Sequence, residues 1–296
     1  MGEITKAIIP LGGLGTRFLP LSRVVTKEFF PLVEKPLVHY VIEELRDSGV
    51  KEIVFVTSQS NKKALSEYFK NDLKLEKLLE EQKKEDLLKA VRNVAKLSEE
   101  ISFSFVQQAN PLGDGHAVLQ AQKLIGNEPC FVAYPDDVME SAQPVSLQLA
   151  KVYKTSEKPV LALYRMPKEK LVSYGSPECE KIANRLYKIR KIAEKPSLES
   201  VPSEFAIVGR RIITPEVFSY LKKAKPNKKG EVVLSEVLGE MVKDGKIVYG
   251  YEIEGKWWEC GDKRSWLFSN TALALKHPEF GKDLQKFIKD EKLIKP

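Results

Sequence analysis

The stretch KAIIPLGGLGTRFLP, residues 6–20, places a short β-rich run directly before a glycine-rich turn. Because they lack side chains, Gly12, Gly13 and Gly15 allow the backbone to approach a ligand closely and to turn its N–H groups toward phosphate oxygens. Arg17 follows them, and its guanidinium group can bind such oxygens. The stretch therefore predicts a strand that ends in an anion-binding loop.

Two familiar phosphate-binding loops do not match this stretch. A P-loop ends in Gly-Lys followed by Ser or Thr, and a dinucleotide-binding fingerprint has a third glycine or alanine where Phe18 stands. The distinctive features that remain are Gly-x-Gly-Thr-Arg, which ends at Arg17, and Lys27 after it.

From this stretch outward, short β-rich runs alternate with amphipathic helical segments, a pattern typical of a parallel sheet flanked by helices. Strands are expected at 6–10, 52–57, 101–107, 130–135, 159–166, 186–192 and 205–213. Apolar residues at spacings of three and four predict helices at 36–49, 61–69, 72–100, 116–126 and 145–156. We therefore predict an α/β fold with a Rossmann-like mixed, mainly parallel sheet.

No Gly/Ser-rich or Pro-rich linker interrupts this series, so we expect a single domain over residues 1–296. After about Pro226 the pattern changes to a helix at 232–245, a strand at 246–255 and a charged helical tail. We predict that residues 227–296 form a C-terminal flap on the main sheet that takes part in oligomerisation.

Composition narrows the functional classes. With 43% hydrophobic residues in 296, the chain can bury a large core. Its net charge of +7 comes from lysines interleaved with acids rather than from a basic stripe, so nucleic acid is not an expected partner. No run approaches the roughly 20 apolar residues of a membrane helix, and the N-terminus lacks the layout of a secretion signal. With three well-separated cysteines, we predict a cytoplasmic protein that binds anionic small molecules.

Several further stretches resemble the sugar-nucleotide pyrophosphorylases in the order found in that family. The resemblance covers nearly the whole chain, is greatest to the bacterial branch that forms UDP-glucose from UTP and glucose 1-phosphate, and implies the nucleotide-diphospho-sugar transferase fold. The stretches that carry it are TKEFFPLVEKPLVHYVIEE, PLGDGHAV, PDDV, AEKP, PSEFAIVGRRIITPEVF, KGEVVLSEVL and WECGDK.

The resemblance implies a role for each residue of the nucleotide site. Arg17 and Lys27 are the expected catalytic residues, which hold the triphosphate and balance charge as pyrophosphate leaves. The expected nucleotide-binding residues are Leu11, Gly12, Gly13, Gly15, Thr16, Glu28, Gln108 and Gly113.

The resemblance also implies a sugar-phosphate site and a magnesium site. The expected sugar-phosphate-binding residues are His116, Gly175, Glu194 and Lys195. Asp136 follows an apolar strand, where the carboxyl end of a parallel sheet opens to ligands, and carboxylates there suit Mg²⁺. The family has a second metal-binding aspartate before Cys-Gly, but here Glu259 stands in its place, so either Glu259 or Asp262 could complete the site.

The sequence departs from the uridylyltransferase pattern at two places near the glycine-rich turn. Leu11 to Gly13 replace the usual Ala-Ala-Gly, and Thr26 replaces a proline, so the turn is more like that of thymidylyltransferases. Three alternatives therefore stay open: another nucleotide or hexose 1-phosphate such as dTTP, a non-catalytic sugar-nucleotide sensor, and a nucleic-acid binder. The expected substrates are UTP and glucose 1-phosphate, with Mg²⁺ as cofactor and a homodimer or homotetramer as the assembly.

Overall fold

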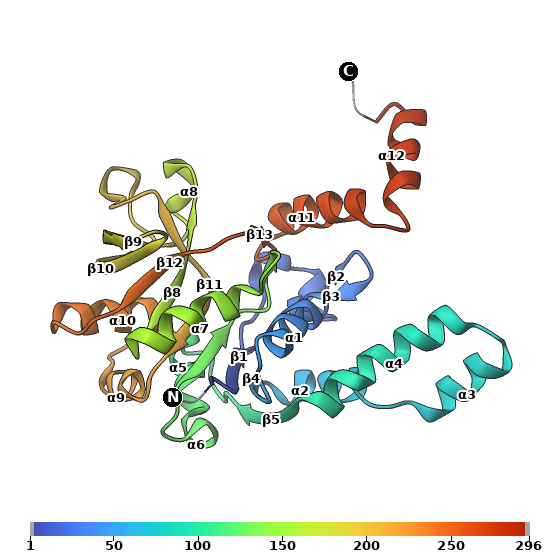
Figure 1. The fold of residues 1–296 in the computed structure, drawn as a ribbon, viewed down its shortest axis with the longest axis horizontal. Coiled ribbons are helices and arrows are strands. Elements are labelled where there is room, and N and C mark those ends of the chain that lie inside the picture. The colour runs from blue at the N-terminus through green and yellow to red at the C-terminus, as the bar shows by residue number, and fades with distance from the viewer. Residues whose placement is uncertain (1–2, 294–296) are drawn as a thin grey trace.

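The computed structural model describes residues 3–293. Most strands belong to one large sheet: β1 (Lys6–Pro10), β4 (Glu52–Thr57), β5 (Ser102–Gln107), β6 (Cys130–Ala133), β8 (Val160–Arg165), β9 (Gly175–Ala183), β10 (Leu186–Glu194), β11 (Phe205–Ile213) and β12 (Tyr249–Glu252). Their order is β5-β4-β1-β6-β11-β8-β12-β10-β9 (Figure 1). Two smaller sheets pair β2 (Pro31–Leu32) with β3 (Lys35–Pro36) and β7 (Asp137–Glu140) with β13 (Lys256–Glu259).

The direction of the strands confirms the predicted mixed, mainly parallel sheet. β5, β4, β1 and β6 pair in parallel, as do β8 and β12. β11 and β10 are antiparallel to both of their neighbours. Seven of the nine strands therefore run in one direction, and the carboxyl ends of β1, β5 and β6 meet at one edge of the sheet.

The predicted helices are also present, but two of them, at 72–100 and 116–126, are each divided into two helices. The helices are α1 (Leu37–Asp47), α2 (Gln59–Tyr68), α3 (Leu73–Glu81), α4 (Glu85–Glu100), α5 (Asp114–Gln120), α6 (Gln122–Ile125), α7 (Val145–Ser156), α8 (Lys168–Leu171), α9 (Pro215–Lys223), α10 (Leu234–Lys243), α11 (Lys263–Lys276) and α12 (Gly281–Asp290). Short 3-10 turns are η1 (Thr16–Phe18), η2 (Leu21–Arg23), η3 (Lys27–Phe29) and η4 (Leu198–Ser200). The region predicted as helical over 72–100 divides into α3 and α4 because Lys83 adopts a left-handed conformation with φ 55°.

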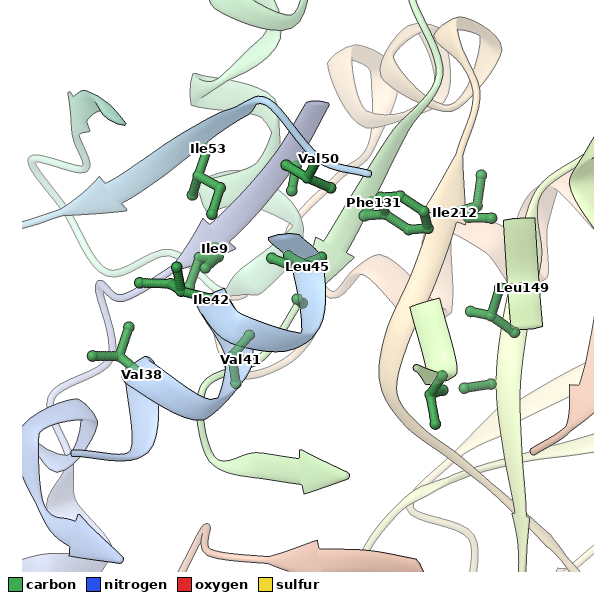
Figure 2. Packing of buried hydrophobic residues seen from close by; sticks show 14 of the residues in the cluster. Ile9, Val38, Val41, Ile42, Leu45, Val50, Ile53, Phe131, Leu149 and Ile212 are labelled. Atoms are coloured by element: carbon green, nitrogen blue, oxygen red, sulfur yellow. The ribbon is translucent and has the colours of Figure 1, made fainter. Parts of the chain in front are cut away.

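The core lies on both faces of the sheet because side chains alternate along each strand. Ala7 and Ile9 of β1 face one cluster, which α1 and α7 cover, whereas Ile8 faces a second cluster beneath α5, α9 and α10. Figure 2 shows the first cluster, where Val41, Ile42 and other residues of α1 pack over β1 and β4. Each buried aliphatic side chain of this kind stabilises the fold by about 1.5–3 kcal/mol, so burial of these two faces fixes the position of the sheet and of its strand ends.

A buried ion pair connects the sheet to α1. Arg210 of β11 has no exposed surface, and its Nη2 donates to Oε2 of Glu44 at 2.7 Å. The other oxygen of Glu44 accepts from the backbone N–H and the hydroxyl of Ser146 at the start of α7. A buried cation is tolerated only when it is paired in this way, so these contacts fix α1 and α7 against β11.

The segment predicted as a C-terminal flap, residues 227–296, is divided in the structure. Its strand β12 is an interior strand between β8 and β10, and α10 packs in the second core cluster. An apolar strand can enter a sheet wherever a position is open, so the sequence change near Pro226 did not mark a structural boundary. α11 and α12 extend away from the sheet, as does the α3–α4 pair (Figure 1). Residues 294–296 of the predicted segment lie outside the described residues.

Among residues 3–293, none of the helices combines the length and the apolar character that crossing a bilayer requires.

Candidate active site

A cavity of about 580 Å³ opens at the edge of the sheet where β1, β5 and β6 end. Ligand sites of open α/β sheets lie at the carboxyl ends of parallel strands. Most of the predicted site residues line this cavity: Gly12, Gly13, Gly15, Thr16, Arg17, Lys27, Glu28, Gln108, Gly113, Asp136, Gly175, Glu194, Lys195 and Glu259. The fold therefore brings together residues that are more than 240 positions apart in the sequence.

The glycine-rich loop follows β1 directly, and the structure explains why glycine stands at two of its positions. The Gln108 side chain lies against Gly12, so a larger residue there would displace Oε1 of Gln108 from its position. Gly15 has φ 61°, a conformation that glycine adopts without strain. The backbone therefore reaches the cavity wall without side chains in the way.

Leu11 does not line the cavity, contrary to the prediction that it binds nucleotide. Its side chain is buried, its N–H donates to the carbonyl of Val56 at 2.7 Å, and its carbonyl accepts from the side-chain amide of Asn61. Both backbone groups are thus already hydrogen-bonded within the protein. The loop becomes available to a ligand only from Gly12 onward.

Lys27 and Asp136 form an ion pair on the cavity wall, with 2.5 Å between Nζ and Oδ2. Burial raises the pKa of the Asp136 carboxyl, but the adjacent Lys27 ammonium more than offsets this, and the pKa lies below its usual value. For Lys27 the signs are opposite: burial lowers the pKa of the ammonium group, but the charge of Asp136 more than offsets this, and the pKa is raised. Both groups are therefore charged at neutral pH.

Glu28 also reaches the cavity wall, and it is 1% exposed. Neither of its carboxylate oxygens has a hydrogen-bond partner within residues 3–293. Burial raises the pKa of this carboxyl group, and the charge of Lys27 opposes the shift. A buried polar group without a partner is costly, so Glu28 is suited to a hydrogen bond with a ligand.

Gln108 and His116 form a chain of side chains behind the cavity. The amide Nε2 of Gln108 donates to the carbonyl of Gly113 at 3.1 Å and lies 3.0 Å from Nδ1 of His116. The other ring nitrogen of His116 lies 3.1 Å from Nε2 of Gln120. His116 does not line the cavity, so the prediction that it binds sugar phosphate is not supported: α5 turns its ring toward Gln108 and Gln120 instead.

Gly113 is required by a close backbone contact. It has φ 99°, and a Cβ atom there would lie 2.4 Å from the carbonyl oxygen of Val232. The next residue, Asp114, accepts from the backbone N–H groups of Gly115 and Leu234 through Oδ1. These contacts fasten the start of α10 to the start of α5 at the cavity wall.

Gly175, Glu194 and Lys195 lie together because β9 and β10 pair with Gly175 opposite Glu194. A Cβ atom on Gly175 would lie 3.0 Å from Oε2 of Glu194, so the glycine makes room for this carboxylate. The hydroxyl of Ser235 donates to the same oxygen at 2.6 Å. Lys195 lies within 3.7 Å of Glu194, and its backbone N–H donates to the carbonyl of Tyr174. A fixed carboxylate thus lies beside an ammonium group.

The pairing of β7 with β13 decides which acidic side chain faces Asp136. A Cβ atom built on Gly261 would lie 3.3 Å from Oδ2 of Asp136 and 3.8 Å from Oε1 of Glu259, so both carboxylates converge on this glycine. Asp262 does not line the cavity. It caps α11, where its carboxylate accepts from the backbone N–H groups of Arg264 and Ser265.

The donor set at this point fits a hard cation that shares its coordination with a ligand. Within the part of the chain that the structure describes, no group of three or more His, Cys, Asp or Glu side chains could hold a metal ion. Mg²⁺ is usually bound through one or two carboxylates together with substrate phosphates, and Asp136 and Glu259 supply two. Asp137 is less suited, because it packs against Gly209, accepts from the indole of Trp257, and has its pKa raised by burial and by Asp136.

The structure adds cavity residues that the sequence reasoning missed. They are polar or aromatic side chains from strand ends and helix starts: Asp114, Tyr134, Arg211, Ser235 and Trp257. One signal was present, since Arg211 interrupts the apolar run FAIVGRRII, and a charged residue in a buried strand needs a partner. Ser235 reaches the cavity because α10 packs against β10, a contact that the sequence does not reveal.

Comparisons with known proteins agree along most of the chain. A family model described as nucleotidyl transferase matches residues 6–274. The chain is 37% identical over 290 residues to a UTP–glucose-1-phosphate uridylyltransferase from Staphylococcus haemolyticus, and the match covers 98% of this chain and 99% of the relative. A solved UDP-glucose pyrophosphorylase complexed with UDP-glucose is 33% identical, with a TM-score of 0.84 over 93% of this chain and 100% of that chain. The UTP-bound enzyme from Acinetobacter baumannii is 30% identical, with a TM-score of 0.86 over 96% of this chain and 98% of that chain.

Proposed function

This chain belongs to the nucleotidyl transferase family, and from that premise we propose that it transfers a uridylyl group from UTP to glucose 1-phosphate, giving UDP-glucose and pyrophosphate. The observation that carries the proposal is one cavity that holds the glycine-rich loop, the Lys27–Asp136 pair and the Glu194–Lys195 pair. Such a cavity can hold a nucleoside triphosphate and a sugar phosphate side by side. The enzyme is therefore a transferase with two small anionic substrates.

The test is pyrophosphate release from UTP and glucose 1-phosphate, with and without Mg²⁺, and with dTTP as the competing nucleotide. We expect turnover that depends on both UTP and Mg²⁺. Preference for dTTP would move the assignment to thymidylyl transfer. Binding of UDP-glucose without any turnover would favour the sensor alternative instead.

In the proposed reaction, an oxygen of the sugar phosphate attacks the α-phosphorus of UTP. A new phosphorus–oxygen bond forms as the bond to the β-phosphate oxygen breaks, and pyrophosphate leaves. The chain needs no protein nucleophile for this step, so positioning and charge balance account for catalysis. The glycine-rich loop from Gly12 onward would hold the triphosphate, and Arg17 and Lys27 would offset the charge that gathers on pyrophosphate.

The other predicted residues have supporting positions. Glu28 and Gln108 would bind the base, and Gly113, which lies on the cavity wall, would contact the nucleotide through its backbone. Asp136 and Glu259 would hold Mg²⁺ together with substrate phosphates; when bound, the ion stabilises the charge of the transferring phosphate group. On the sugar side, the fixed carboxylate of Glu194 would accept from hydroxyl groups, and Lys195 would neutralise the sugar phosphate.

Replacing Lys195 by alanine should raise the KM for glucose 1-phosphate far more than the KM for UTP. The ammonium group pairs with Glu194, whereas Lys27 pairs with Asp136. Loss of a charge-assisted hydrogen bond costs about 1.5–3 kcal/mol, so we expect an increase of about 10- to 100-fold. Steady-state kinetics with each substrate varied in turn measure both constants. If the two constants stay unchanged or rise together, Lys195 does not bind the sugar phosphate.

We also propose that the enzyme is a cytoplasmic homo-oligomer. All three cysteines are free thiols, two of them buried, which is compatible with a reducing compartment. Helices α11 and α12 and the turn between them expose large apolar side chains, and such surfaces mark contacts between chains: Leu267, Phe268, Phe280 and Phe287. Light scattering coupled to gel filtration should give the mass of a dimer or tetramer, and a monomer at micromolar concentration would contradict this proposal.

A further inference from the structure

Arg211 is a cavity residue to which the proposed reaction assigns no role. It comes from β11, two residues after Gly209, where the register of that strand with β8 is interrupted. The side chain is 8% exposed, and it lines the cavity. A buried guanidinium group normally uses most of its five N–H donors, so its partners show whether it is structural or available to a ligand.

Two side chains hold the guanidinium group in place. Nη1 donates to the hydroxyl of Tyr134, which in turn donates to Oδ2 of Asp114 at 2.5 Å. The guanidinium group also stacks over the ring of Tyr134, 4.7 Å from its centroid. Asp114 supplies the counter-charge, with 3.6 Å between its Oδ2 and Nη1. The orientation of Arg211 is therefore fixed before any ligand binds.

The remaining donors of Arg211 are unused. Nε is buried without a hydrogen-bond partner in the described range 3–293, and only Nη1 donates a hydrogen bond there. Burial lowers the pKa of this side chain, but the neighbouring Tyr134, Asp114, Glu194 and Asp137 more than offset this. The pKa is therefore raised overall, and the group stays charged. A fixed cation on the cavity wall with free donors is suited to an oxygen acceptor of a ligand.

The neighbours of Arg211 place it at the sugar end of the cavity. Asp114, its counter-ion, also accepts from the backbone N–H of Leu234. The next residue, Ser235, donates its hydroxyl to Glu194, the carboxylate beside Lys195. Arg211 and Glu194 are thus fixed relative to each other through the start of α10. Because Asp114 already serves as a counter-ion, we expect a neutral hydroxyl rather than a second anion as the acceptor here.

We propose that Arg211 determines sugar specificity by donating from its guanidinium group to one hydroxyl of the hexose 1-phosphate. This inference rests on the proposed function, because it presupposes a hexose 1-phosphate in the cavity. A sugar without that hydroxyl leaves a buried, charged donor unpaired, and sites built for such a hydrogen bond discriminate strongly against the analogue that lacks it. Arg211 and Glu194 together would then define a donor and an acceptor for the sugar ring.

The experiment compares glucose 1-phosphate with its monodeoxy analogues at carbons two, three, four and six, all with UTP. The enzymes are the wild type, Arg211→Met, Arg211→Lys, and the control Arg190→Met, which changes an exposed arginine of β10. We expect the wild type and the control to use one analogue with a kcat/KM that is about 10- to 100-fold lower than for glucose 1-phosphate. Arg211→Met should lose this discrimination for that analogue alone, whereas Arg211→Lys should keep part of it.

Each ratio compares two substrates with the same enzyme preparation, so partial unfolding of a variant does not imitate the effect. If Arg211→Met discriminates among the analogues as the wild type does, the inference is wrong. If it changes discrimination against deoxyribose forms of UTP instead, Arg211 binds the nucleotide and the inference is also wrong. Absence of wild-type turnover with glucose 1-phosphate would overturn the proposed function, and this inference with it.

Discussion

Replacing Lys27 by methionine should reduce kcat about 10²- to 10³-fold, the loss typical of removing one group that stabilises transition-state charge. Methionine has nearly the length of lysine but carries no charge, and Lys27 lies beside the loop that we expect to hold the triphosphate. The change also removes a positive charge that pairs with Asp136. Because this ammonium group competes with a cation for the same carboxylate, its loss should not weaken cation binding, and the Mg²⁺ concentration for half-maximal activity should not rise.

Initial rates of pyrophosphate release at saturating substrates, with Mg²⁺ varied, measure both quantities for Lys27→Met. The matched control is Lys35→Met, since Lys35 lies after the same loop but pairs with Glu43 and does not line the cavity. We expect the control to keep the wild-type kcat and Mg²⁺ dependence. A Lys27→Met enzyme with unchanged kcat would show that this ammonium group is structural.

The sequence was sufficient for the strands and helices that have strong internal patterns. β1, β4, β6 and β8 are short apolar runs bounded by turns, and the structure places all of them in the sheet. β9 was missed because GSPECEKIA carries three charged residues; it is extended because it pairs along its length with β10. β13 was missed because a four-residue strand has no internal pattern, and it exists through its pairing with β7.

For the site, local motifs identified the segments that form the cavity but not which of their residues face it. Leu11 and His116 belong to matching motifs, yet β1 uses the backbone of Leu11, and the Gln108 and Gln120 side chains surround His116. Glu194 and Lys195 were predicted only through the family resemblance, because Glu-Lys-Pro alone is a common tripeptide. Contacts across the fold, such as that between Asp114 and Arg211, depend on packing that no local pattern contains.

The choice between Glu259 and Asp262, which the sequence left open, depends on one tertiary contact. Both acids are close in the chain to Gly261, and either could reach a cation near Asp136. The pairing of β7 with β13 places Glu259 opposite Asp137, on the cavity wall, whereas Asp262 accepts hydrogen bonds from the first turn of α11. A carboxylate that already caps a helix would lose those hydrogen bonds on binding a cation. We therefore propose Glu259 as the second metal ligand.

Replacing Asp136 by asparagine should lower kcat by about 10²-fold or more, because loss of a metal-stabilised charge costs several kcal/mol and each 1.36 kcal/mol is tenfold in rate. Asparagine keeps the shape of the side chain but has no charge, so it weakens cation binding and leaves Lys27 without its ion-pair partner. The Mg²⁺ concentration for half-maximal activity should rise in parallel. Pyrophosphate release across a Mg²⁺ titration measures both quantities.

Two further variants separate the metal site from its surroundings. Glu259→Gln should also raise the Mg²⁺ requirement, because it removes the second carboxylate that converges on Gly261. Asp262→Ala should keep the Mg²⁺ requirement but lower the stability by about 0.5–2 kcal/mol through loss of the N-cap of α11, which thermal unfolding detects. If Asp262→Ala alone changes the Mg²⁺ dependence, then Asp262 and not Glu259 is the second metal ligand. If Asp136→Asn keeps the wild-type Mg²⁺ dependence, the cation is bound elsewhere, and the ion pair with Lys27 serves only to orient that lysine.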